Sequence, residues 1–331
     1  MSNSLSIKKR LNYIDLYKGI CILLIIFTHY DWSVEERRYF GFPFWVDMAV
    51  PVFMIISGYL YALTNNGKSL SVQYNFLRII SKWIRFIIPF SIVWILELIV
   101  HILTDDSVTV GTILFNYVTG GNGPGSYYFP VMIQFVIIAP MILKLIEKYN
   151  IKGLAACFVI NLFFEILKNV INMSVDYYRL SAIKYIFVIA YGIYLYFERE
   201  KPLSALHIIF SIVGGLYIII YCYAGVIPLI TSMWTGTSMF ACMFIFGIMK
   251  WLILYDKVQQ PFLELLGKAS FNIFLVQMFY YWPIDNIVNG IFHNRIIQLS
   301  MGFIFSIVIG LLFYKFENPI TTRVIKNIKS Q

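Results

Sequence analysis

The stretch from Phe86 to Val100 reads FIIPFSIVWILELIV, with a single charged residue, and it decides the fold class. The runs Ile20–Phe27 and Phe303–Phe313 contain no charge at all. Strands of membrane barrels alternate apolar and polar residues, whereas these runs are continuous and therefore predict helices. Of the 331 residues 60% are hydrophobic and 13% charged, against about 25% charged in soluble domains. We expect an all-α polytopic membrane protein, with residues 1–331 forming one membrane-embedded domain.

A helix that crosses a bilayer needs about 20 mainly apolar residues. This length predicts about ten spans, at residues 14–30, 44–63, 80–103, 127–146, 153–168, 182–197, 205–223, 235–253, 264–283 and 298–316. The ninth of these ranges has the weakest apolar pattern.

The positive charges indicate how these spans are oriented. Of the 26 Lys and Arg residues, 19 fall in the connections on the side of the N-terminus, six fall on the other side, and Lys18 lies within the first span. Cytoplasmic connections are enriched in Lys and Arg. We therefore expect both termini in the cytoplasm, in a multi-pass protein of the cell (plasma) membrane. The net charge of +9 then reflects topology, and nucleic acid is not an expected partner.

Three ionisable residues lie in the first predicted span, where charge is costly. Lys18 and His29 are eleven residues apart, which puts them on one helix face about 17 Å apart along the axis. Asp15 precedes Lys18 by three residues and can form an ion pair with it. Histidine suits proton transfer near neutral pH. The alternative is an interfacial histidine that is hydrogen-bonded to a neighbouring helix.

The third predicted span begins with three cations on one face, at the spacing i, i+4 and i+7, namely Arg78, Lys82 and Arg85. Such a cluster suits the phosphates of a nucleotide-like donor such as coenzyme A. It would equally suit anchoring to anionic lipid.

Further polar residues of the apolar segments are candidates for contacts with a substrate. They are Asp47, Ser57, Glu97 and His101. Asp47 could instead orient His29 or be an ordinary interfacial carboxylate, and Ser57 could serve helix packing together with Gly58. The four cysteines are scattered singly through apolar segments, so we expect free thiols, with no metal site and no disulfide framework.

Several segments, in their order along the chain, resemble the acyltransferase 3 family of membrane acyltransferases. Lys18 and His29 fit its Arg/Lys-x10-His motif. The other matching segments are Pro51-Val-Phe-Met-Ile-Ile-Ser57-Gly58-Tyr59, Lys82-Trp-Ile-Arg85 before Pro89, Leu266-Gly-Lys-Ala-Ser-Phe-Asn-Ile-Phe-Leu-Val-Gln277, and Glu317-Asn-Pro319. Many members have histidine where this chain has Gln277, so no second catalytic histidine is expected there.

The resemblance implies ten helices and transfer of an acyl group, usually acetyl from acetyl-CoA, onto a hydroxyl of a surface polysaccharide, a lipid-linked glycan or a small molecule. On this basis His29 would act as general base or transient acyl carrier, supported by Lys18 and Asp15. Acyl-CoA would be a donor substrate rather than a tightly bound cofactor. The alternative function is an exporter of glycans or lipid-linked precursors that has no acyl-transfer activity.

Overall fold

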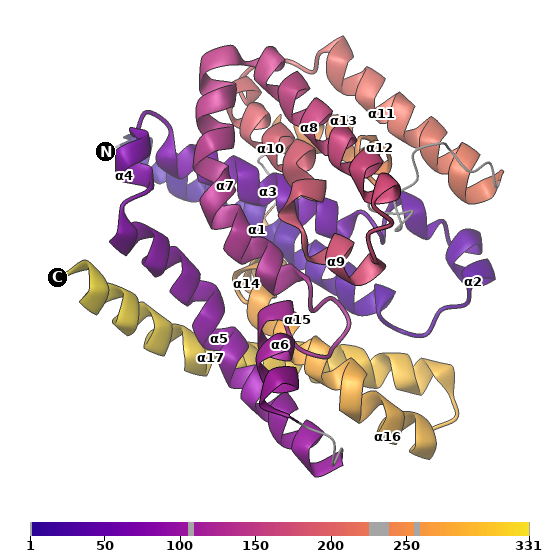
Figure 1. Ribbon diagram of the computed structural model, residues 1–331. Coiled ribbons are helices and arrows are strands. Elements are labelled where there is room, and N and C mark those ends of the chain that lie inside the picture. Colours follow the sequence, from indigo (N-terminus) through magenta and orange to yellow (C-terminus); the bar gives the residue numbers. More distant parts are fainter. Residues whose placement is uncertain (1, 105–108, 225–237, 255–258, 331) are drawn as a thin grey trace.

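The computed structural model describes residues 2–104, 109–224, 238–254 and 259–330, and its side chains are described from residue 12 onward. Within these ranges the chain forms helices and turns and no strand (Figure 1). The all-helical prediction is therefore confirmed for the described residues.

The long helices form a bundle, and short helices lie within it and in its connections. The long ones are α1 (Ser2–Thr28), α3 (Ala49–Asn65), α5 (Phe76–Thr104), α7 (Tyr128–Tyr149), α8 (Ile151–Val170), α10 (Ile186–Glu198), α11 (Ala205–Ile218), α13 (Phe244–Leu254) and α17 (Arg295–Lys329). The short ones are α2 (Val34–Tyr39), α4 (Leu70–Gln73), α6 (Val110–Thr119), α9 (Val175–Leu180), α12 (Met239–Cys242), α14 (Pro261–Lys268), α15 (Ser270–Phe279) and α16 (Asp285–Ile291). Tighter or wider turns occur at η1 (Phe42–Phe44), η2 (Ala182–Tyr185), η3 (Ile219–Tyr223) and η5 (Tyr280–Ile284).

Six described helical segments are long and apolar enough to cross a membrane, and a seventh is α14 with the helix that follows it, bent by 67°. The bend falls in the range 264–283, where the apolar pattern is weakest. The other expected spans fall on α1, α10 and α12–α13, which are shorter or more polar than a typical span; residues 235–237 lie outside the described residues. Ten spans therefore stay a prediction.

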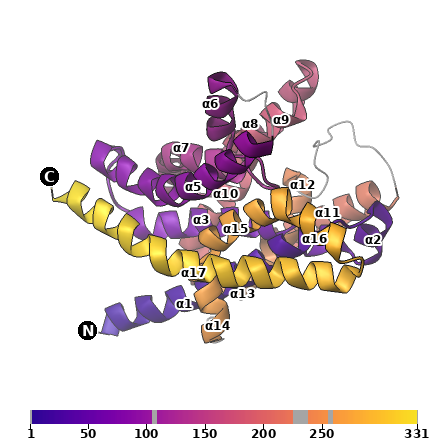
Figure 2. The same ribbon diagram turned by 90° about the horizontal axis from the view of Figure 1, so that it is seen from below.

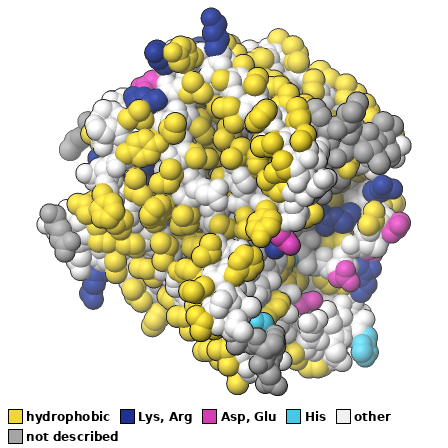
Figure 3. Space-filling model, viewed as in Figure 1, with side chains coloured by type: hydrophobic (Ala, Val, Ile, Leu, Met, Phe, Trp, Pro, Cys, Tyr) yellow, Lys and Arg dark blue, Asp and Glu magenta, His cyan; other side chains and the backbone are white. Residues whose placement is uncertain are grey.

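Both ends of the chain lie at the same end of the bundle, opposite α2 and α16 (Figures 1 and 2). Apolar side chains cover much of the molecular surface, as Figure 3 shows for one face. On α17 the exposed ones include Ile304, Leu312 and Phe316. Soluble proteins rarely expose apolar patches of this extent to water, so the surface is that of an integral membrane protein.

Glycines bring pairs of helices into backbone contact, as small residues do in membrane bundles. A Cβ atom on Gly58 of α3 would lie 2.3 Å from the carbonyl oxygen of Ile189, and one on Gly192 of α10 would lie 2.0 Å from that of Ile55. The crossing of α1 and α14 is equally close, because a Cβ on Gly19 would lie 2.0 Å from the Leu263 carbonyl oxygen. These contacts set the distances between the helices that surround the site.

Gly192→Ala is expected to destabilise the protein, because the new methyl group meets a backbone oxygen that cannot rotate away. We expect a loss at or above the upper end of the ~1–3 kcal/mol that overpacking costs. The matched control is Gly290→Ala on α16, where no atom lies within 4 Å of the added carbon. Thermal unfolding in detergent should separate the two variants, and equal melting temperatures would contradict the packing described above.

Candidate active site

A cavity of about 1150 Å³ runs through the bundle beside α1, and both Lys18 and His29 line it. The two residues are separated by about 17 Å of helix rise, so the cavity is at least that long. Its middle is apolar, with Ile22, Ile25 and Phe53 on the wall. An elongated ligand with one polar end would fit this distribution.

Three cations, Lys18, Arg85 and Lys268, line the end of the cavity nearer the start of α1. Lys268 ends α14 at the crossing with α1, where a Cβ on Gly267 would lie 1.7 Å from the carbonyl oxygen of Asp15. The Asp15 carboxylate forms the expected ion pair with Lys18 at 3.0 Å. Lys268 was missed from sequence because it is adjacent to Lys18 only through the α1–α14 crossing.

The three cations of α5 that were expected to bind phosphates do not all face the cavity. Arg85 lines the cavity, but Arg78 and Lys82 do not. The Lys82 ammonium lies over the Tyr61 ring, 4.3 Å from its centroid, and Arg78 is exposed. Residues that share a helix face can still lie at different heights, and only Arg85 is at the height of the cavity.

His29 lies immediately beyond the last residue of α1 and is partly buried. Its Nδ1 is 2.7 Å from Oε1 of Gln277 on α15. The Gln277 amide has a defined orientation because its Nε2 donates to the carbonyl oxygen of Pro124 at 3.3 Å. Oε1 can only accept, so Nδ1 of His29 carries the proton in the neutral ring. Nε2 is then the basic nitrogen.

The glycine-rich segment 119–126 forms the wall beside His29. Pro124 and Gly125 line the cavity. Gly125 has φ +89°, and a Cβ there would lie 3.4 Å from Cε1 of His29 and 2.9 Å from the Phe274 ring. Glycine is needed at this position both for the left-handed backbone and for the close approach to the imidazole.

Asp47 and Ser57 both line the cavity, as expected of substrate-contacting residues. Asp47 does not contact His29: its Oδ1 accepts from Arg37 at 2.6 Å, and the orienting partner of the histidine is Gln277. Gly58, next to Ser57, serves the α3–α10 contact. Because neighbouring residues of a helix point in different directions, Ser57 faces the cavity while Gly58 faces α10.

Glu97 and His101 do not line this cavity. Glu97 is buried and accepts a hydrogen bond from the backbone N–H of Asn122 at 3.0 Å, so it holds the glycine-rich segment in place. His101 lines a second cavity of about 560 Å³ on the other side of that segment. A direct contact between Glu97 and a substrate stays a prediction; in this structure one of its carboxylate oxygens accepts from the 119–126 backbone.

The buried ion pair of Glu165 and Lys168, 3.1 Å apart, lies outside both cavities. Tyr178 donates to Glu165 at 2.6 Å. This pair therefore ties α8 to α9 and serves structure. The four cysteines are buried and free.

A helical bundle with an apolar surface and a large cavity, lined by cations and by an oriented imidazole, defines an integral membrane protein with a candidate ligand site. The family model of the acyltransferase 3 domain matches residues 11–315. The chain belongs to the acyltransferase 3 family, and so to the membrane acyltransferases. No curated protein and no solved structure matches it.

Proposed function

We propose that the protein transfers an acyl group, acetyl in the simplest case, from cytoplasmic acyl-CoA to a hydroxyl group of an extracytoplasmic glycan. The observation that carries the proposal is a single cavity lined by both Lys18 and His29. The proposal includes ten spans in the plasma membrane, with both termini in the cytoplasm. The common position of the two termini at one end of the bundle supports this arrangement.

The donor would enter from the cytoplasm with its phosphates at Lys18, Arg85 and Lys268, since clustered cations favour phosphate groups. Its thin pantetheine arm would lie along the apolar wall formed by Ile22, Ile25 and Phe53. Asp15 would keep Lys18 directed along its helix through their ion pair. The thioester would then arrive next to His29.

In the transfer step, Nε2 of His29 removes the proton of the acceptor hydroxyl, and the hydroxyl oxygen attacks the thioester carbonyl carbon. The carbon–sulfur bond breaks, the acyl group becomes an ester of the acceptor, and the leaving thiolate takes the proton from the imidazolium. Alternatively, Nε2 attacks the thioester carbonyl carbon, the carbon–sulfur bond breaks, and the thiolate leaves an acyl-imidazolium that keeps its Nδ1 proton. The acceptor hydroxyl then attacks the acyl carbon, the carbon–nitrogen bond breaks, and the hydroxyl proton passes to the thiolate. Asp47 and Ser57 lie on the wall where the acceptor would bind.

Surface glycan from cells with and without the gene should differ in ester-linked acyl groups. Proton NMR of the purified polymer is expected to show O-acyl signals that disappear on deletion and on mild alkaline treatment, while the amount of polymer is unchanged. Loss of the polymer itself from the cell surface would instead support an exporter and would contradict the proposed reaction.

A further inference from the structure

Helix α2 presents a cationic face to the end of the cavity that holds His29. Val34, Arg37 and Arg38 all line the cavity. Their spacing of i, i+3 and i+4 places them on one side of the helix. The adjacent acids, Glu35 and Glu36, do not line the cavity.

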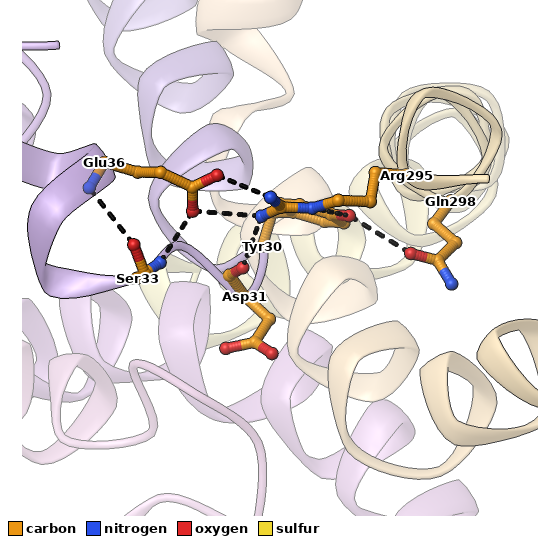
Figure 4. Close-up of polar contacts among 6 residues, drawn as sticks. All are labelled: Tyr30, Asp31, Ser33, Glu36, Arg295 and Gln298. Carbon is orange, nitrogen blue, oxygen red and sulfur yellow. Dashed lines mark hydrogen bonds and ion pairs between the residues drawn. The ribbon is translucent and has the colours of Figure 1, made fainter. Parts of the chain in front are cut away.

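Glu36 is held away from these arginines by the start of α17. Its Oε2 accepts from Arg295 at 3.0 Å and from the backbone N–H of Ser33 at 2.8 Å (Figure 4). Arg295 also contacts the Tyr30 hydroxyl at 3.3 Å. The hydrogen bonds from Arg295 and Ser33 lower the pKa of Glu36 to about 2. Glu36 is therefore ionised at neutral pH and neutralises Arg295 rather than Arg37 or Arg38.

A third arginine, Arg179 of α9, lines the cavity and also the second cavity of about 560 Å³. Its ion-pair partner Asp176 is 3.3 Å away, with a side chain that is 75% exposed. Nε of Arg179 is buried and has no hydrogen-bond partner among the described residues. Arg179 thus has donor capacity left at the boundary between the two cavities.

Among the described residues that line the larger cavity, Asp47 is the sole carboxylate, and it is paired with Arg37. Arg38 has no carboxylate partner among the described residues that line this cavity, and Arg179 is paired only with the largely exposed Asp176. Guanidinium groups bind carboxylates and phosphates through paired hydrogen bonds, so this end of the cavity is suited to an anion.

The second cavity offers groups of a different kind. Its wall carries hydroxyls, amides and a phenyl ring, from Thr112, Thr119, Asn116, Asn122 and Phe115, as well as the imidazole of His101. Amides and hydroxyls both donate and accept, as sugar hydroxyls require, and an aromatic face suits the apolar side of a sugar ring.

We propose that the acceptor is an anionic saccharide. Its carboxylate or phosphate group binds Arg38 and Arg179, and its neutral sugar units occupy the second cavity. The inference rests on the proposed function, which makes the acceptor a glycan. It adds that this glycan carries a negative charge.

The test is a binding measurement that does not require acyl transfer. Full-length protein in nanodiscs is titrated with an oligogalacturonate, with its uncharged methyl ester of the same length, and with a phosphorylated oligomannose. At least one anionic saccharide is expected to bind tenfold or more tightly than the methyl ester. The carboxylate and phosphate arms show which anion is preferred.

The double variant Arg38→Gln/Arg179→Gln is expected to lose this preference. Arg323→Gln, an exposed residue near the end of α17, should retain it, as should His29→Ala. A methyl ester that binds as tightly as both anions, or an unchanged preference in the double variant, would overturn the inference. Retained preference in a protein without any acyl transfer would overturn the proposed reaction alone.

Discussion

Replacing His29 by alanine is expected to lower the rate of acyl transfer by about 10²–10⁴-fold, the range of general acid–base catalysis. The variant should fold, because His29 follows the last turn of α1 and faces an existing cavity. Purified protein in detergent is assayed with acetyl-CoA and an oligosaccharide acceptor, and the thiol released is measured. A low rate with an unchanged melting temperature is the expected result.

The matched control is His293→Ala, which removes an exposed imidazole from the segment before α17. Its rate should equal that of the unmodified protein. Mass spectrometry after incubation with donor alone separates the two routes, because an acyl-imidazole adds the acyl mass to the peptide containing His29. A His29→Ala variant that transfers at nearly the original rate would exclude both routes.

Gln277→Leu is expected to have the second largest effect, a loss of about 10–100-fold in kcat. Leucine has nearly the same volume as glutamine but cannot accept a hydrogen bond from Nδ1–H of His29. The ring proton can then move to Nε2, and that nitrogen no longer acts as a base. Loss of the correct tautomer costs more than this range in serine proteases, where the partner is a charged carboxylate. The KM for the donor should not change, because Gln277 is absent from the wall of the cavity.

Gln277→Glu separates positioning from simple packing. Glutamate keeps an oxygen that can accept from Nδ1 and loses the donor that contacts Pro124. We expect it to recover most of the activity that leucine loses. If both variants are impaired equally, the role of Gln277 is to hold the 119–126 segment rather than to select the tautomer of His29.

The helical class and the Asp15–Lys18 ion pair could be predicted because both depend on local sequence. Apolar runs of sufficient length have few alternatives in a bilayer, and a spacing of three residues brings two side chains together on any helix. Lys18 and His29 line one cavity for the same reason, since α1 carries Lys18 and leads directly into His29.

The partners of these residues depend on packing between distant segments and could not be predicted in the same way. Gln277 lies 248 positions from His29, and the sequence marks it only as the position where many members of the resembled family have histidine. Lys268 reaches the cavity because Gly267 allows α14 to contact α1. Glu97, by contrast, was expected to contact a substrate, and its burial gave no sign that a backbone N–H would donate to one of its oxygens. Predicting such partners would require knowing which distant segments pack against each other, and a single motif does not contain this information.

The crossing of α1 and α14 has a consequence for the empty and loaded forms of the protein. Gly19 follows Lys18 and Gly267 precedes Lys268, and both glycines sit in backbone-to-backbone contact. Lys18, which is paired with Asp15, and the exposed Lys268 therefore lie at the same helix crossing. In the proposed reaction, a polyphosphate bound at this crossing would pair with both ammonium groups, so the coenzyme would link α1 to α14 while it is bound.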